Sequence, residues 1–204
     1  MPRSRWDSGL TPELGMYVRI LQSFGLVWAL FALVWFVSGL STKPVARRQT
    51  AVSRWGQIAL AVTGFALISS PSLQVGVLAD RILPRMAAVA LAGLAITALG
   101  IAFAFWARFT LGGNWSGTVT VKEGHTLVQR GPYGLVRHPI YTGLLTAAAG
   151  SAFAVGNLGA LVGLALVFVY CRVKYELEER FMLEEFGDEY IRYRERVPAL
   201  VPFA

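Results

Sequence analysis

The residues best suited to chemistry in this sequence form two clusters, one with imidazole and phenol groups and one with carboxylates. His138 directly precedes Pro139, with Tyr141 two positions further on, and Glu178 and Glu179 follow later in the chain. Proline is well tolerated as the first residue of a helix, so the His138 imidazole is predicted to sit where a helix begins. Imidazole, phenol and carboxylate groups together can hold and orient a polar ligand by hydrogen bonds.

A purely structural interpretation also fits each histidine and tyrosine. His138 and His125 can serve as helix-capping or interfacial histidines. Tyr133 and Tyr141 can belong to the belt of aromatic residues that lies at membrane surfaces. From the residue types alone, both the binding and the structural interpretation therefore stay open.

The two adjacent glutamates differ in direction. Neighbouring residues on a helix point about 100° apart, so at most one of Glu178 and Glu179 is expected to reach a given pocket directly. Residues 172–196 hold eight of the twelve acidic residues of the chain. A solvated helix with pairs such as Glu176 to Arg180 would also account for most of these charges.

Other kinds of active site do not fit the spacing. His125, His138 and Cys171 do not lie at the separations of a zinc site, and no helical His-Glu-x-x-His run occurs. The Gly112-Gly113 pair follows no predicted strand and matches neither a dinucleotide-binding nor a P-loop pattern. We therefore expect no metal site and no soluble nucleotide-binding domain.

The elements that position these residues are predicted from hydropathy. Hydrophobic residues make up 55% of the chain and charged residues 15%, which is more apolar than a soluble domain normally is. A helix needs roughly 20 apolar residues to span the hydrocarbon of a bilayer. The apolar blocks that come close to this length are residues 17–40, 55–79, 86–109, 140–155 and 158–173.

Local signals refine these blocks. Pro71 predicts a kink or a stop in the second block, where freed backbone groups need other partners. The third block is rich in Ala and Gly, which favours close helix contacts. The last two blocks are too short for a simple crossing and predict a tilted or incompletely crossing hairpin. The acidic segment predicts a helix that ends at Gly187, followed by a short helix through Tyr190 and Tyr193.

The predicted fold class is thus an all-α integral membrane protein with about five transmembrane segments, the last two a short helical hairpin. A cytoplasmic, glycine-rich binding loop and a C-terminal amphipathic helix complete it. We expect two regions, an N-terminal three-span region of residues 1–109 and a catalytic region of residues 110–204.

The distribution of basic residues predicts the orientation. With five segments, 14 of the 19 Lys and Arg residues fall on the side of the glycine-rich loop and the C-terminus. Cytoplasmic loops carry the excess of Lys and Arg, so the C-terminus is predicted to be cytoplasmic and the N-terminus external. The basic residues form no continuous face, and we expect no nucleic-acid partner.

Several runs in the second half of the chain share their order and spacing with a known family. They are Gly131-Pro132-Tyr133, Arg137-His138-Pro139-Ile140-Tyr141-Thr142-Gly143, Glu178-Glu179, Phe186-Gly187-Asp188-Glu189-Tyr190, Tyr193, Val197 and Pro202. This pattern resembles the isoprenylcysteine carboxyl methyltransferases and their prokaryotic relatives. The resemblance covers residues 111–204, while the first three spans match only in hydropathy.

The resemblance implies a methyltransferase that takes its methyl group from S-adenosylmethionine. The family's binding positions for this cofactor fall on Thr118, His125, Thr126, Leu127, Val128, Tyr133, His138, Pro139, Ile140, Tyr141 and Glu178. The family commonly has a substrate-contacting arginine four residues before the glutamate. This chain has Lys174 there, with Arg172 nearby, and a lysine does not bind a carboxylate in the planar, two-bond manner of arginine.

The expected acceptor is a lipid-like carboxylate or a small apolar thiol, reached within the membrane among its lipids. No residue is assigned as general base, because the sulfonium methyl is already activated. The alternatives are a phospholipid or lipid-amine N-methyltransferase and a non-catalytic membrane protein. The Ala-, Gly- and Arg-rich composition favours the inner membrane of a prokaryote as the location.

Overall fold

The computed structural model describes residues 11–39, 51–112 and 127–202, and helices dominate all three ranges. No β-sheet forms among these residues, which confirms the all-α prediction for this part of the chain. The helices are α1 (Pro12–Gly39), α2 (Ala51–Ser69), α3 (Ala87–Leu111), α4 (Pro139–Val155), α5 (Leu158–Phe186) and α6 (Asp188–Arg196), with single 3-10 turns at Pro71–Leu73, Gly76–Ala79 and Gly131–Gly134.

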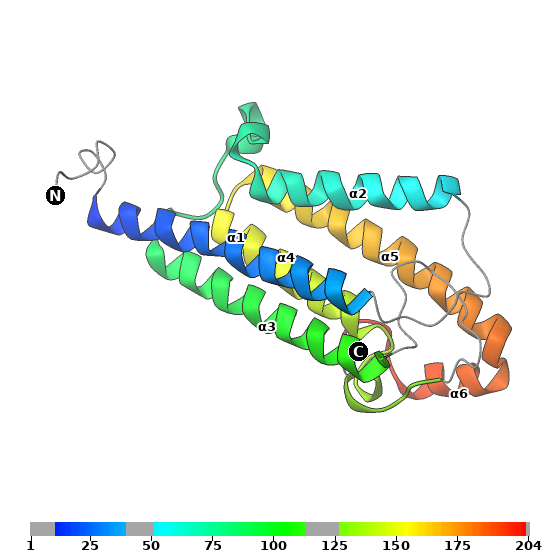
Figure 1. Ribbon diagram of the computed structural model, residues 1–204. Coiled ribbons are helices and arrows are strands. Elements are labelled where there is room, and N and C mark those ends of the chain that lie inside the picture. The colour runs from blue at the N-terminus through cyan, green and yellow to red at the C-terminus, as the bar shows by residue number, and fades with distance from the viewer. Residues whose placement is uncertain (1–10, 40–50, 113–126, 203–204) are drawn as a thin grey trace.

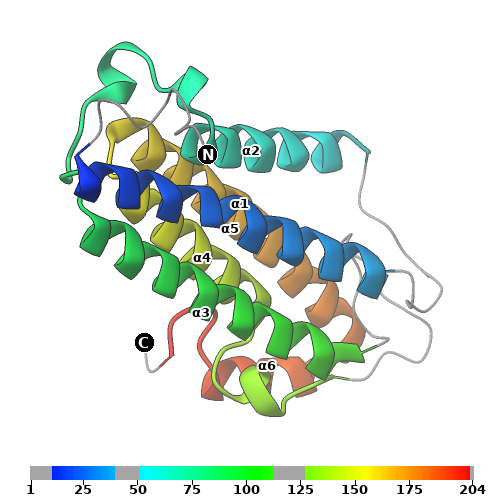
Figure 2. The ribbon, with the colours of Figure 1, turned by 60° about the vertical axis from the view of Figure 1, so that its left-hand side comes forward.

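The five long helices run side by side as one bundle, with α4 in its middle (Figures 1 and 2). On one side α4 packs along α3, which also contacts α1. On the other side α4 packs against α5, and α2 packs against α5 in turn. The short helix α6 lies across one end of the bundle (Figure 1). That end is where the candidate site forms.

Glycines bring α3 and α4 into backbone contact. A Cβ atom added at Gly100 would lie only 2.5 Å from the Ala147 nitrogen, and one added at Gly150 would lie 2.6 Å from the Gly93 oxygen. Gly143 meets Gly100 in the same way. Helices in lipid gain stability from such close packing of small residues, as the Ala- and Gly-rich third block predicts.

Among the described residues, three helices, α1, α3 and α5, are long and apolar enough to cross a membrane. The apolar α4 is shorter, with 17 residues. The number of five membrane segments therefore stays a prediction. The proposed division into residues 1–109 and 110–204 stays one as well.

The expectation of a short final hairpin is wrong for its second limb. Instead of ending near Val173, α5 continues through the acidic segment to Phe186, a length of 29 residues. The physical reason is that good helix formers follow Val173 without a glycine or proline to interrupt them. Gly187, with a φ of 50° that favours glycine, ends the helix as predicted. The acidic glutamates thus lie on the same rigid helix that packs against α4.

At the opposite end of the bundle, α2 stops before Pro71, as predicted. The Gln74 side-chain amide donates hydrogen bonds to the carbonyls of Leu67 (3.2 Å) and Ile68 (3.4 Å) in the last turn of α2. Its oxygen accepts one from the Asn157 side chain (2.8 Å). These bonds give the carbonyls freed at Pro71 their partners and connect the α2 end to the α4–α5 turn.

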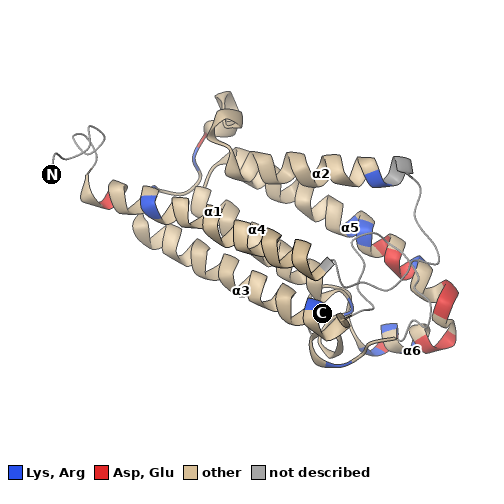
Figure 3. Ribbon diagram, viewed as in Figure 1, with Lys and Arg blue, Asp and Glu red and all other residues tan. Residues whose placement is uncertain are grey.

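Charged residues concentrate at one end of the bundle. Figure 3 shows Lys, Arg, Asp and Glu along the second half of α5 and on α6, while α1, α2 and α3 carry few charged residues and α4 carries none. An apolar bundle with one strongly charged end suits a protein that lies in a bilayer and meets water at that end.

Candidate functional site

The candidate site begins where α4 begins. Pro139 is the first residue of α4, as predicted, and His138 precedes it as N-cap without using its side chain as a cap. Instead the buried imidazole reaches across to α5. Its Nε2 atom lies 3.1 Å from Glu179 Oε1, and its Nδ1 atom lies 3.7 Å from Glu178 Oε2. The capping interpretation of His138 is therefore wrong.

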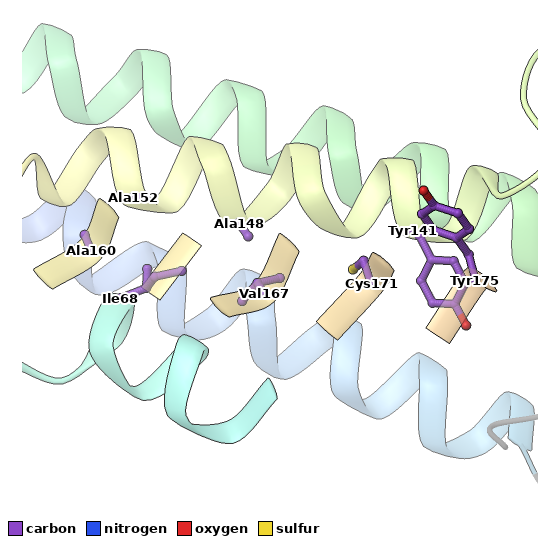
Figure 4. Close-up of a cluster of buried hydrophobic side chains, with 8 residues drawn as sticks. All are labelled: Ile68, Tyr141, Ala148, Ala152, Ala160, Val167, Cys171 and Tyr175. Atoms are coloured by element: carbon purple, nitrogen blue, oxygen red, sulfur yellow. The ribbon is translucent and has the colours of Figure 1, made fainter. Parts of the chain in front are cut away.

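Glu178 is held by the first turn of α4. The buried Tyr141 hydroxyl donates a hydrogen bond to Glu178 Oε1. The Tyr175 ring stacks on the His138 imidazole with ring centres 5.0 Å apart. Figure 4 shows Tyr141 and Tyr175 next to each other at one end of the buried hydrophobic cluster. The Glu178 side chain is 30% exposed, so its carboxylate is within reach of a ligand.

Glu179 faces a different set of partners. Its Oε1 atom accepts hydrogen bonds from Arg137 Nε (2.8 Å) and from His138, and it pairs with Arg137 Nη2 at 2.7 Å. Arg194 Nε of α6 lies 3.6 Å from its other oxygen. The side chain is only 12% exposed. The two adjacent glutamates thus point to different surroundings, and only Glu178 has an open carboxylate.

The C-terminal segment closes one side of the site. The backbone N–H groups of Arg137 and His138 donate to the carbonyls of Pro198 (2.8 Å) and Ala199 (3.0 Å). The Thr142 hydroxyl donates to a further carbonyl of this segment at 2.7 Å. These bonds hold the backbone at the start of α4 in place, although the chain there is not helical.

Tyr133 enters the site from the 3-10 turn Gly131–Gly134. The Tyr193 hydroxyl of α6 donates to the Tyr133 carbonyl at 2.6 Å, which fixes this turn against α6. Burial of the phenol, together with the negative charge of Glu178, raises the pKa of Tyr133 well above its usual range. Tyr133 is therefore a neutral phenol at physiological pH, able to donate a hydrogen bond.

The charge on His138 depends on the two glutamates. Burial of the imidazole opposes protonation, but hydrogen bonds and negative charges from Glu178 and Glu179 outweigh it and raise the pKa of His138 above its ordinary value. A protonated imidazole between two carboxylates is the state that this arrangement favours.

The structure brings four of the predicted cofactor residues together: Tyr133, His138, Tyr141 and Glu178. Pro139 and Ile140 lie between two of them in the first turn of α4. Leu127 and Val128 are half-buried in the segment before the 3-10 turn. The remaining predicted positions, Thr118, His125 and Thr126, lie outside the described residues.

The two predicted substrate contacts do not share a face. Lys174 is buried within α5. The Arg172 side chain is 54% exposed and pairs with Glu176 at 2.7 Å, with its guanidinium over the Tyr175 ring. Glu176 thus pairs with Arg172, four residues before it, and no ion pair with Arg180 forms among the described residues. Lys174 is thus enclosed by the bundle, whereas Arg172 is exposed to solvent.

Sequence reasoning missed the network around Arg137. Arg137 belongs to the run that carries the family resemblance, but it was given no role in the site. It donates to Glu179 and also to the carbonyls of Arg194 (3.2 Å) and Val197 (2.5 Å). Its position directly before the His138-Pro139 pair was the feature of the sequence that could have indicated a role in the site. Its partners become visible only once α5, α6 and the C-terminal segment are placed together.

The comparisons with known proteins cover this same part of the chain. Residues 91–184 match the family described as isoprenylcysteine carboxyl methyltransferase (ICMT). Protein-S-isoprenylcysteine O-methyltransferase B of Arabidopsis thaliana is 31% identical over 114 residues, which cover 54% of this chain and 58% of that protein. The human protein-S-isoprenylcysteine O-methyltransferase is 35% identical over 114 residues, 54% of this chain and 40% of that protein.

Two further matches are a methyltransferase of a small thiol and a solved structure. Methanethiol S-methyltransferase 1 of Bradyrhizobium diazoefficiens is 42% identical over 71 residues, 35% of this chain and 24% of that protein. A solved structure of a eukaryotic intramembrane Ras methyltransferase, isoprenylcysteine carboxyl methyltransferase, superposes with a TM-score of 0.65 at 21% identity. That match covers 92% of this chain and 68% of the other, so the two proteins share a fold. Residues 91–184, which contain Tyr133, His138, Tyr141 and Glu178, thus match the isoprenylcysteine carboxyl methyltransferase family, and the chain as a whole shares the fold of the solved member.

Proposed function

We propose that this protein is a membrane methyltransferase that uses S-adenosylmethionine to methylate a lipid-like carboxylate or a thiol. The observation that carries the proposal is the meeting of His138, Tyr141 and Glu178 at the charged end of an apolar bundle. The match of residues 91–184 to a methyltransferase family supports methyl transfer. The relatives' names include both O- and S-methyltransferases, so the acceptor class is part of the proposal.

The chemistry of the site fits the cofactor. Glu178 uses Oε1 for Tyr141, and its partly exposed carboxylate can accept hydrogen bonds from the amino or hydroxyl groups of S-adenosylmethionine. A protonated His138 can bind a carboxylate, and tyrosine rings can lie against a sulfonium cation. The proposed cofactor contacts remain Thr118, His125, Thr126, Leu127, Val128, Tyr133, His138, Pro139, Ile140, Tyr141 and Glu178.

When bound, S-adenosylmethionine supplies a methyl group already activated by its positive sulfur. The protein then has to orient the reactants and exclude water, and orientation can lower a barrier by about 7 to 11 kcal/mol. Tyr141 and His138 orient Glu178 from two sides, and the C-terminal segment holds the start of α4. An ionised carboxylate or thiolate needs no proton removed, so no general base is assigned.

Lys174 is the proposed contact of the acceptor. Its buried ammonium can attract one anionic atom, whether of a carboxylate or of a thiolate. The exposed pair of Arg172 with Glu176 makes Arg172 the weaker candidate. An amine acceptor would have to lose a proton before attack, so turnover that requires high pH would favour the alternative of lipid-amine N-methylation.

The proposed location is the inner membrane of a prokaryote, with the N-terminus outside and the charged end in the cytoplasm. S-adenosylmethionine is made in the cytoplasm, so the site must open to that side. A thiol-reactive probe applied outside sealed cells should label a cysteine at exposed Asp80 but none at exposed Asp188. The native Cys171 is buried and gives little background. Labelling at position 188 from outside would overturn the orientation.

Cofactor binding tests the proposal directly. S-adenosylhomocysteine, the demethylated product, should bind the detergent-solubilised protein in calorimetry and raise its melting temperature, because a ligand that binds only the folded state stabilises it. S-adenosylmethionine should do the same. A folded sample that shows neither heat of binding nor a thermal shift with either compound would contradict the proposed function.

A further inference from the structure

Glu179 constrains the proton on one side of the His138 ring. Its Oε1 atom lies 2.8 Å and 2.7 Å from two nitrogens of Arg137 and 3.1 Å from His138 Nε2. An arginine is always charged in proteins, so the carboxylate paired with it is ionised and can only accept hydrogen bonds. His138 Nε2 must therefore carry a proton to make its 3.1 Å contact.

This constraint leaves one variable atom in the ring. With Nε2 protonated, His138 Nδ1 is either a second N–H donor or a bare lone pair. It faces Glu178 Oε2 at 3.7 Å. A lone pair there would face a carboxylate and repel it, whereas an N–H group would attract it. The state of Nδ1 therefore decides how Glu178 is held on the side that Tyr141 does not reach.

We propose that Glu179 is a positioning residue: through His138 Nε2 it sets the protonation of the imidazole, so that Nδ1 donates toward Glu178 and the cofactor site. Glu179 itself does not touch the cofactor. The role in cofactor binding rests on the proposed function, but the protonation pattern of the ring does not.

The groups that surround His138 agree with this assignment. From α5 it faces Glu178, Glu179 and the stacked Tyr175 ring, and from α4 the Tyr141 ring at 6.0 Å. From the described part of the C-terminal segment, a backbone carbonyl accepts the His138 N–H. The carboxylates are thus the charged groups in direct contact with the ring.

Two arginines compensate the charge of Glu179. Arg137 contacts it at 2.7 Å and Arg194 lies 3.6 Å away, while Glu178 pairs with neither of them among the ion pairs of the described residues. The negative charge of Glu178, which has no such arginine partner, therefore adds to that of Glu179 in stabilising the protonated imidazole. The raised pKa of His138 agrees with a ring that stays charged over a wider pH range than a free histidine.

Nitrogen NMR on histidine tests the proposal without any enzyme assay. The chain has only two histidines, so selective ¹⁵N-histidine labelling in detergent gives two sets of signals, and a His125→Gln variant assigns them. The ¹⁵N shifts distinguish a protonated from a bare ring nitrogen. We expect His138 Nε2 to carry a proton at every pH where the protein is folded, with titration confined to Nδ1.

The Glu179→Gln variant tests the source of this pattern. The glutamine oxygen can still accept from Nε2 but brings no charge, so the midpoint of the His138 titration should fall by about one pH unit. Glu176→Gln, on the exposed face of the same helix, should leave it unchanged. A bare Nε2 in the wild type, or an unchanged midpoint in Glu179→Gln, would overturn the proposal. The wild-type spectrum decides the question even if the variant does not fold.

A binding measurement connects the ring to the cofactor. The affinity of Glu179→Gln for S-adenosylhomocysteine should fall further below that of the wild type at pH 8 than at pH 6, since fewer of its His138 rings stay charged at pH 8. If the substitution only disturbed the local structure, affinity would fall equally at pH 6 and pH 8. That result would contradict the positioning role. If the wild type binds no S-adenosylhomocysteine but shows the expected NMR pattern, the proposed function fails and the ring assignment stands.

Discussion

The Tyr141 hydroxyl in the first turn of α4 donates a hydrogen bond to Oε1 of Glu178, a residue of α5. The two helices also pack against each other along the hydrophobic cluster that contains Tyr141 and Tyr175. Because the phenol occupies one oxygen, the carboxylate is oriented before any ligand arrives. A site arranged in advance loses less entropy when it binds.

Replacing Tyr141 with phenylalanine should therefore weaken cofactor binding while leaving the core packing intact. A hydrogen bond to a charged group contributes about 1.5 kcal/mol or more, so the dissociation constant for S-adenosylhomocysteine should rise roughly tenfold. Calorimetry on the purified variant measures this. Tyr17→Phe is the matched control, since its hydroxyl bonds to the Ala154 carbonyl (3.1 Å) at the opposite end of the bundle. Equal losses in both variants would mean that Tyr141 only stabilises the fold.

Glu178→Gln should weaken binding more than Glu179→Gln when both are measured at pH 6. Glu178 has the partly exposed carboxylate, and loss of a charged acceptor should cost about ten- to hundredfold in affinity. Glu179 is enclosed by Arg137, His138 and Arg194 and acts only through the ring. The reverse order of the two losses would show that the assignment of the two glutamates is wrong.

The close contact of α3 with α4 should not tolerate a methyl group. In Gly100→Ala the new Cβ would meet backbone atoms at 2.5 and 2.6 Å, and such overpacking destabilises by about 1 to 3 kcal/mol. A lower melting temperature in detergent would show this. Gly25→Ala in α1 is the control, because no atom lies within 4 Å of its added Cβ and alanine favours helix. A Gly100→Ala protein as stable as the control would contradict the packing found.

The stability of the protein should fall as pH rises above the ordinary pKa of histidine. His138 has a raised pKa when folded, so it stabilises the folded state fully below about pH 6.5, the unfolded value. This contribution is lost as pH rises to the folded pKa, at up to about 1.4 kcal/mol per pH unit. The free energy of unfolding, followed by denaturant titration between pH 6 and 8, should decline less steeply in His138→Gln. Identical slopes would mean that the imidazole is not charged in the folded protein.

The sequence predicts the helices well because their signals are local. Apolar blocks locate α1, α2 and α3, Pro71 marks the end of α2, and Gly187 marks the end of α5. The continuity of α5 was missed because hydropathy changes sharply near residue 173 while the helix does not. A change from lipid-facing to water-facing residues leaves backbone hydrogen bonding unaffected.

The site was predicted less completely, because its contacts join segments far apart in the chain. The order of residues around His138, Tyr141 and Glu178 pointed to a shared pocket, and the structure places these three together. No local pattern shows that Glu179 faces Arg137, since this depends on how α5 rotates against α4. For the same reason, the exposure of Arg172 and the burial of Lys174 could not be separated from sequence alone.

Transfer of an isotopically labelled methyl group is the most direct measurement of the central claim. The purified protein, incubated with methyl-labelled S-adenosylmethionine and a bacterial lipid extract or a set of small apolar thiols, should form a labelled acceptor that mass spectrometry detects. At a cofactor concentration below the wild-type dissociation constant, formation should fall about tenfold or more in Glu178→Gln and persist in Glu176→Gln, whose pair with Arg172 is exposed. A wild-type protein that binds S-adenosylmethionine but labels neither lipids nor thiols would contradict the proposed acceptors. One that neither binds the cofactor nor labels any acceptor would contradict the methyltransferase assignment itself.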